Sequence, residues 1–325
     1  MESLTDAMGS TRLSDEPEEP EQLLFNPSPN SGIDETILNN IPRYLFRLAT
    51  PNSAGITNER WVCSESVRQN TPSSMEDVFF NMDNEKQIKV ARILDSHLWW
   101  RQARNPDDNF VSWTSSLLFV LQYIYYRHYK DGTSLAEIKL YVVDTMKFPR
   151  GTFMLDLNLI DIFRDYNDGL ENLWSLRNRP NLYFGEYLSQ GSLMIENKCQ
   201  AITAEVIFKQ DRLRRIQPHF AELHHGKRED KPEWVREVNR LRNTIWPPPG
   251  SPLISPTELG DRLQAVQEIL QHVSADWKCP VAIYFAALIG PEGFIRGQDT
   301  ANDKVVGTDP RSVYLPRELF KRFCP

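Results

Sequence analysis

The sequence lacks the features that mark membrane and secreted proteins. No stretch approaches the ~18 consecutive apolar residues of a membrane span, and the acidic start, MESLTDAMGSTRLSDEPEEPEQ, fits neither a secretory signal nor a mitochondrial transit peptide. The four cysteines are widely spaced and none forms a CxxC pair, which argues against a disulfide framework. These absences predict a soluble protein of the cytoplasm or nucleus that has no membrane partner.

An excess of positive charge is also missing. The formal net charge is −7, and residues 1–40 contribute −8 of it (nine acidic residues and one basic), which leaves +1 for residues 41–325. A nearly neutral remainder argues against a nucleic-acid partner. Residues 1–38, rich in Glu, Pro, Ser and Asn, have too few core-forming side chains to offset their ordering entropy. We expect a disordered acidic tail there, dispensable for folding.

Several motifs that carry common chemistries are absent. The six histidines form no HExxH pattern or Cys/His cluster, and the sequence contains no GxxxxGK[ST], GxGxxG or GxSxG motif. We therefore expect no metal site, no P-loop and no nucleophile elbow.

The pattern of apolar residues predicts an α+β fold. Residues 41–47, 110–115 and 138–142 have the composition or alternation of strands, whereas 85–100 and 117–129 have helical spacing. Alternation of Ile202, Ala204, Val206 and Phe208 predicts another strand. Two helical patterns follow residue 231, so the sequence divides into an α+β domain at 39–220 and a helical C-terminal extension at 221–325.

Three blocks follow one another in an order that suggests a site. Arg47 closes the apolar run Leu45-Phe46-Arg47, Ser112 belongs to the hydroxyl-rich block Phe-Val-Ser-Trp-Thr at 110–114, and Glu186 stands within the aromatic block Tyr-Phe-Gly-Glu-Tyr-Leu-Ser-Gln-Gly at 183–191. This order resembles the Arg–Ser–Glu class of ADP-ribosyltransferases, the group that includes the heat-labile enterotoxin A subunit. The resemblance implies a split antiparallel β-sandwich with flanking helices.

The resemblance implies NAD as the substrate and assigns roles within the blocks. Glu186, Ser112 and Arg47 would be the catalytic residues. The carboxylate would stabilise an oxocarbenium-like state, the serine would orient it, and the arginine would grip a phosphate. The nucleotide would contact Arg47, Ser112, Thr114, Tyr183, Tyr187 and His97. The implied function is an intracellular mono-ADP-ribosyltransferase or NAD glycohydrolase with a protein acceptor that the sequence does not identify.

One position departs from the transferase pattern. Phe184 stands where those enzymes have the first carboxylate of a Glu-x-Glu motif, and a phenyl ring cannot accept a proton from an arginine acceptor. This argues against arginine transfer and leaves hydrolysis, another acceptor, or a catalytically degenerate module that acts in protein interaction or regulation.

A second resemblance extends over about residues 41–220. The blocks IPRYLFR, VSWTSSLLF and GEYLSQG resemble those of a group of filamentous-fungal proteins, which implies no particular activity. Structural roles also remain open: Arg47 could be an ion-pair partner, Glu186 could lie on a solvated strand face, and the aromatic residues Trp99, Trp100 and Tyr123 could be packing residues.

Overall fold

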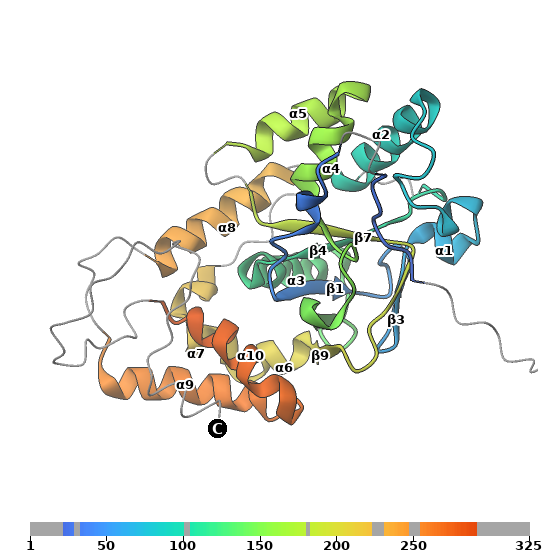
Figure 1. Ribbon diagram of the computed structural model, residues 1–325. Helices are drawn as coiled ribbons and strands as arrows, with labels where there is room; N and C mark the ends of the chain where they lie inside the picture. The colour runs from blue at the N-terminus through green and yellow to red at the C-terminus, as the bar shows by residue number, and fades with distance from the viewer. Residues whose placement is uncertain are drawn as a thin grey trace, which may run out of the picture.

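Two antiparallel sheets form the centre of the fold (Figure 1). The computed structural model describes residues 22–28, 33–100, 105–179, 183–222, 231–246 and 254–290. The large sheet has the strand order β6 (Met154–Leu155), β7 (Glu186–Gln190), β4 (Phe110–Thr114), β1 (Tyr44–Ala49), β5 (Lys139–Asp144) and β9 (Cys199–Thr203). The small sheet has the order β2 (Ile56–Thr57), β3 (Trp61–Cys63) and β8 (Ser192–Met194). The predicted mixture of helices and strands is confirmed.

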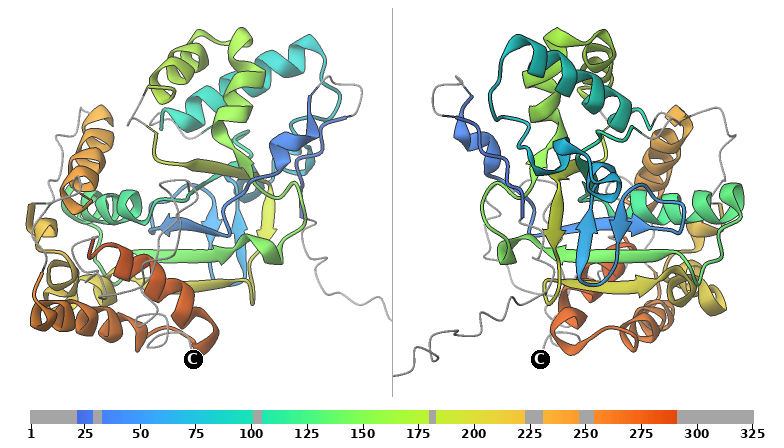
Figure 2. Two further views of the ribbon diagram at one scale, coloured as in Figure 1. Left: turned by 60° about the vertical axis from the view of Figure 1, so that its left-hand side comes forward. Right: turned by 90° about the vertical axis from the view of Figure 1, so that its right-hand side faces the viewer.

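The helices gather in two groups, one toward the β6 end and one toward the β9 end of the large sheet, at the top and bottom of both views in Figure 2. One group contains α2 (Asn84–Leu98), α4 (Asp156–Phe163) and α5 (Asp168–Arg177). The other contains α6 (Ala204–Phe208), α7 (Arg212–Ile216), α9 (Pro256–Leu270) and α10 (Ala275–Ala287). The remaining helical segments are η2 (Glu35–Leu38), α1 (Glu65–Gln69), η3 (Pro72–Met75), α3 (Leu117–Asp131), η4 (Thr145–Lys147), η5 (Arg164–Tyr166), η6 (Lys209–Asp211), η7 (Pro218–Glu222) and α8 (Lys231–Ile245).

Strand alternation separates the two faces of the large sheet. Leu45, Val111, Trp113 and Tyr187 point to the face that packs on the small sheet, where they form one apolar cluster. The opposite face is covered by helices in two halves, with α3 and the C-terminal helices over β1, β5 and β9, and α2, α4 and α5 over β4, β7 and β6. The boundary between these halves crosses β4.

Strands β1 and β4 separate soon after they meet. They share a single register pair, Phe46 with Thr114, whereas β4 and β7 are paired along five residues from Phe110–Gln190 to Thr114–Glu186. The split leaves room between β1 and β4 for a side chain. The pairing of β4 with β7 places Ser112 and Glu186 on the same face of the sheet, since Glu186 is opposite Thr114 and residues two apart along a strand share a face.

A sharp turn at Gly191 carries the chain from β7 in the large sheet to β8 in the small sheet. Gly191 has φ +63°, and a Cβ there would lie 3.0 Å from the Leu23 side chain, so the turn strongly favours glycine. The Oδ1 atom of Asn109 accepts hydrogen bonds from the Gly191 amide and from the hydroxyls of Ser64 and Ser66. Asn109 thereby ties β4, the Gly191 turn and the start of α1 together.

The predicted tail boundary at residue 38 is wrong, because part of that segment packs against the domain. Phe25 is only 2% exposed and its amide donates to the Gly151 carbonyl at 2.8 Å. Gln22 forms a parallel bridge with Ser192, and Leu38 in η2 is buried. Composition missed these contacts because a few apolar side chains in a polar segment are enough to anchor it. Residues 1–21 lie outside the described part of the chain.

The C-terminal helices share a core with the sheet. One apolar cluster runs from Phe46 and Ile124 to Leu263 and Phe285, so α9 and α10 pack on the same interior as β1 and α3. The predicted strand at 202–208 is wrong beyond Thr203, where α6 begins and buries Ala204 and Ile207 at helical spacing. Residues 291–325 of the predicted extension lie outside the described residues.

We predict that the N-terminal segment contributes to stability through Phe25. Phe25→Ala should lower the free energy of unfolding by about 3–5 kcal/mol, the usual loss for a buried phenylalanine, as measured by urea denaturation. Phe80→Ala is the matched control, since Phe80 is 58% exposed and its loss should change stability by less than about 0.5 kcal/mol. Equal effects of the two substitutions would show that the segment is dispensable.

Candidate functional site

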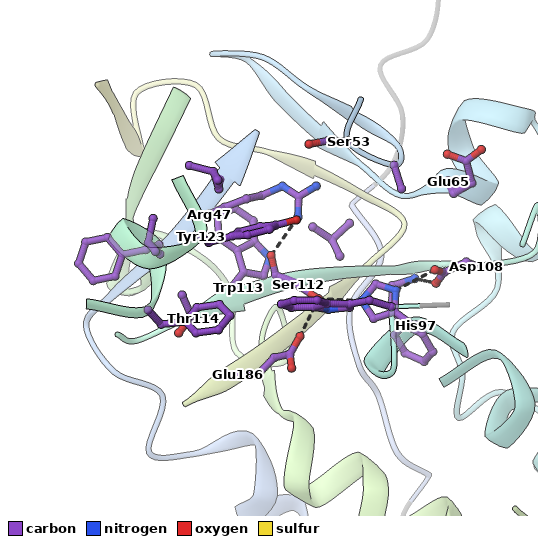
Figure 3. Close-up of a pocket in the computed structure, with 18 of the residues that line it drawn as sticks. Arg47, Ser53, Glu65, His97, Asp108, Ser112, Trp113, Thr114, Tyr123 and Glu186 are labelled. Carbon is purple, nitrogen blue, oxygen red and sulfur yellow. Dashed lines mark hydrogen bonds and ion pairs between the residues drawn. The ribbon is translucent and has the colours of Figure 1, made fainter. Parts of the chain in front are cut away.

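A cavity of about 360 Å³ opens beside α2 and α3 and reaches into the split between β1 and β4 (Figure 3). Its walls come from β1, β4 and β7 of the large sheet and from α2 and α3. The candidate residues Arg47, His97, Ser112, Thr114 and Glu186 all line it. Five side chains predicted from distant parts of the sequence thus share one space.

Ser112 and Glu186 are directly bonded. The Ser112 hydroxyl donates to Glu186 Oε1 at 2.8 Å, and Glu186 is only 1% exposed. Gly185, at φ +71°, sets the start of β7, since a Cβ there would lie 2.1 Å from Ser115 Oγ. The carboxylate is therefore held at a defined place on the sheet face, which excludes the alternative of a solvated strand side chain.

A histidine and an aspartate extend this contact. His97, in the last turn of α2, has Nε2 2.8 Å from Ser112 Oγ and Nδ1 2.7 Å from Asp108 Oδ2. Burial lowers the pKa of His97, but the nearby Asp108 and Glu186 carboxylates raise it by more, so the net shift is upward from 6.5. Arg47 acts in the lowering direction. Asp108, His97, Ser112 and Glu186 form a continuous line of contacts.

The Arg47 side chain extends from β1 to β4 where these two strands separate. Its Nε donates to Thr57 Oγ1 at 3.1 Å and its Nη1 donates to the Ser112 carbonyl at 2.9 Å, while the guanidinium lies 6.0 Å from the Trp113 ring. Burial lowers the pKa of Arg47 to about 10, so the group stays cationic at neutral pH. No carboxylate among the described residues forms an ion pair with it, and the structural ion-pair alternative therefore has no partner here.

A buried ion-pair network lies behind the carboxylate. Arg177 Nη2 donates to Glu186 Oε2 at 2.7 Å, and Arg177 also pairs with Asp156 at the start of α4. The Tyr183 hydroxyl contacts Asp156 Oδ1 at 2.7 Å and the Glu186 carbonyl at 3.0 Å. Two carboxylates thus share one guanidinium, so the three charged groups sum to one negative charge in their ionised forms.

The predicted aromatic contacts are in part wrong. Tyr187 points to the other face of the sheet, in the cluster with Trp113, because it is adjacent to Glu186 in a strand. Tyr183 does not line the cavity and is engaged with Asp156. The aromatic side chains that line the cavity are others, among them Trp100, Phe119, Tyr123 and Phe184.

Phe184 and Thr114 support the wall of the cavity. Phe184 stacks on Phe119, with the ring centroids 4.0 Å apart and an interplanar angle of 3°. Thr114 lines the cavity, but its hydroxyl donates to the Phe184 carbonyl at 3.0 Å and accepts from the Ser116 amide. These main-chain bonds fix the loop that leads into α3, so the predicted contact between the Thr114 hydroxyl and a nucleotide would require one of them to be shared.

Sequence reasoning missed Arg177, Asp156 and the contact of Asp108 with His97. Arg177 ends α5 among exposed residues, and no local pattern distinguishes it from a surface arginine. Asp108 stands four residues before Ser112, yet its partner His97 belongs to another element. These groups meet only through the tertiary fold.

A comparison with known protein families bears on the region that holds the site. Residues 40–195 match a family model described as a domain of unknown function, DUF7587. The matched region contains Arg47, His97, Ser112 and Glu186, and it ends before β9 and the C-terminal helices. No curated protein and no solved structure matches the chain. Within the described residues, no helix is long and apolar enough to cross a membrane, and no group of three or more metal-binding side chains occurs.

We predict that Arg177 compensates two buried carboxylates. Arg177→Met should lower the free energy of unfolding at neutral pH by about 3–5 kcal/mol, the cost of breaking a buried ion pair. Arg179→Met is the control, because Arg179 is exposed and its loss should change stability by less than about 0.5 kcal/mol. Urea denaturation measures both. A loss of under 1 kcal/mol at Arg177 would contradict the proposed compensation.

Proposed function

We propose that the protein binds NAD and cleaves its nicotinamide–ribose bond, with Glu186 as the catalytic carboxylate and water as the favoured acceptor. The observation that carries this proposal is the 2.8 Å hydrogen bond from Ser112 to Glu186 on the wall of a cavity that also holds the Arg47 guanidinium. These are the three residues that the resemblance to ADP-ribosyltransferases selects.

The chemistry requires a buried negative charge. When the bond between ribose C1′ and the nicotinamide nitrogen breaks, its electron pair leaves with nicotinamide and positive charge develops on the ribose. Glu186 would accept a hydrogen bond from a ribose hydroxyl and stabilise that charge, and the effect is strong in a site that excludes water. Attack by water on C1′, with loss of a proton, would complete hydrolysis to ADP-ribose.

Arg47 supports the choice of an anionic ligand. A partly buried guanidinium is costly without a carboxylate partner, and none of the described residues supplies one to Arg47, so a phosphate placed in the cavity would compensate it. The planar fork can bind a phosphate through its remaining hydrogen atoms. Its two bonds to Thr57 and to the Ser112 carbonyl hold the group in a fixed orientation.

The architecture is compatible with a relationship to the transferase fold. Two antiparallel sheets pack face to face, and β1 and β4 separate beside the candidate site. Phe184 supports hydrolysis over arginine transfer, because its ring stacks on Phe119 and supplies no second carboxylate. The alternative is a degenerate module that keeps the fold for interaction or regulation, and activity measurements distinguish the two.

We predict that the wild-type chain releases nicotinamide from NAD and that Glu186→Gln lowers turnover at least ~100-fold, because the amide lacks the negative charge. Chromatography of the products measures the rate. Glu171→Gln is the control, since this glutamate is 52% exposed outside the cavity, and it should leave turnover unchanged. Absence of nicotinamide release by the wild type would favour the interaction module.

We predict that Arg47→Lys weakens NAD binding by at least about 10-fold, since an ammonium cannot reproduce the bonds of the guanidinium. Isothermal titration calorimetry with ADP-ribose, which lacks the cleavable bond, measures binding without turnover. Arg179→Lys serves as the control on the surface. Equal affinity of wild type and Arg47→Lys for ADP-ribose would remove Arg47 from the proposed phosphate site.

A further inference from the structure

The line of contacts from Asp108 to Glu186 has too few hydrogen atoms to be satisfied in every charge state. It contains three links: Asp108 to His97, His97 to Ser112, and Ser112 to Glu186. Each link needs one hydrogen, and the ionised carboxylates supply none. The serine supplies one hydrogen, so the imidazole must supply two for all three links to form.

The protonation of His97 therefore sets the direction of the serine hydroxyl. With both ring nitrogens protonated, Nδ1 donates to Asp108, Nε2 donates to Ser112, and the serine hydrogen is free to point to Glu186. With a neutral ring whose hydrogen stays on Nδ1, Nε2 becomes an acceptor and takes the serine hydrogen. Glu186 Oε1 then faces an oxygen lone pair and loses its donor.

The charges around His97 favour the cation. Asp108 approaches Nδ1 from the loop before β4, and Glu186 on β7 adds a second negative charge. Arg47 on β1 opposes them, and the Phe110 ring approaches at 5.8 Å without a charge. Burial alone lowers the pKa of His97, yet the two carboxylates outweigh burial and Arg47, so the pKa is raised from 6.5.

We propose that His97 and Asp108 are a positioning pair, in which the cationic form of His97 turns the Ser112 hydroxyl toward Glu186. Protonation of His97 thereby switches the candidate site on. The effect on NAD cleavage rests on the proposed function, whereas the placement of the His97 and Ser112 hydrogens does not. Loss of the Nε2 proton to water lets the serine hydrogen rotate from Glu186 to His97. The carboxylate is then held only from its Arg177 side.

The sign of the pH dependence follows from the raised pKa. His97 is cationic below its folded pKa, so Glu186 keeps its Ser112 donor there and loses it as the pH rises through that value. The contribution of the charged pair to stability has the same sign. It is fully present below the unfolded pKa near 6.5 and is lost as the pH rises through the folded pKa.

A nucleophilic serine would use the same three side chains differently. An Asp–His–Ser line with a neutral imidazole is the arrangement by which a base activates a serine for acyl transfer. Here Ser112 Oγ also lies 2.8 Å from a carboxylate that requires a donor, and the positioning role satisfies both contacts. A serine nucleophile is therefore the competing outcome of the test.

Nuclear magnetic resonance of the full chain with ¹⁵N-labelled histidine tests the proton arrangement without NAD. His97→Gln assigns the resonance, and the exposed His272 in the wild-type chain is an internal control. We expect His97 to titrate above 6.5 with both nitrogens protonated at lower pH. Asp108→Asn should lower its midpoint by roughly 1–3 pH units, the effect of removing an opposite charge in contact, and should leave His272 unchanged.

The pH profile of nicotinamide release tests the switch. Turnover should fall as the pH rises through the His97 midpoint. In Asp108→Asn the decline of turnover should move to lower pH by the same interval as the His97 midpoint. Turnover of this variant should therefore recover in acid, whereas a variant that had only lost its structure would not recover. If His97 titrates as expected and nicotinamide is never released, the proposed function fails and the positioning pair stands.

Three results would overturn the proposal. The first is a His97 midpoint at or below 6.5, and the second is a midpoint that Asp108→Asn does not shift. The third is covalent labelling of Ser112 by a fluorophosphonate probe, lost in Ser112→Ala, which would establish a serine nucleophile in place of a positioning hydroxyl.

Discussion

The carboxylate of Glu186 is buried, and the surrounding elements are arranged to compensate its charge. Removing an ionised carboxylate from water costs several kcal/mol unless partners replace the lost hydration. Ser112 satisfies one oxygen and Arg177 the other. Because these partners come from β4 and α5, the contact fixes how the helices on that half of the sheet sit against β7.

The same constraint propagates outward through the fold. Arg177 is itself buried, and Asp156 at the start of α4 shares its charge. On the cavity side, Ser112 lies in β4, which separates from β1 on one side and pairs with β7 on the other, so the carboxylate faces the cavity beside α2 and α3. The hydrogen bonds between Asn109 and Gly191 hold the ends of β4 and β7 against the small sheet. A rigid strand pair thereby carries the serine and the glutamate.

The sequence could predict the blocks but not all of their partners. The runs at 110–115 and 117–129 predict β4 and α3 closely, and the order of Arg47, Ser112 and Glu186 predicts residues that line one cavity. Because successive side chains of a strand point to opposite faces, the sequence also predicts that Tyr187 lies on the face opposite Glu186. By contrast, nothing local marks Arg177, since its burial depends on where α5 packs. The 202–208 alternation failed because Ala204 and Ile207 also fit helical spacing.

The two sides of Glu186 differ in a way that bears on its chemistry. Arg177 is shared between Glu186 and Asp156, which leaves the group of three charges negative. The cavity side ends in His97, which can change charge near neutral pH. Phe184 adds a third element, because its stack with Phe119 places apolar surface on the cavity wall beside the carboxylate. Apolar surface lowers the local dielectric and strengthens any charge interaction there. A carboxylate at position 184 would have added a like charge beside Glu186 and drawn in water, whereas the phenyl ring keeps this part of the wall apolar.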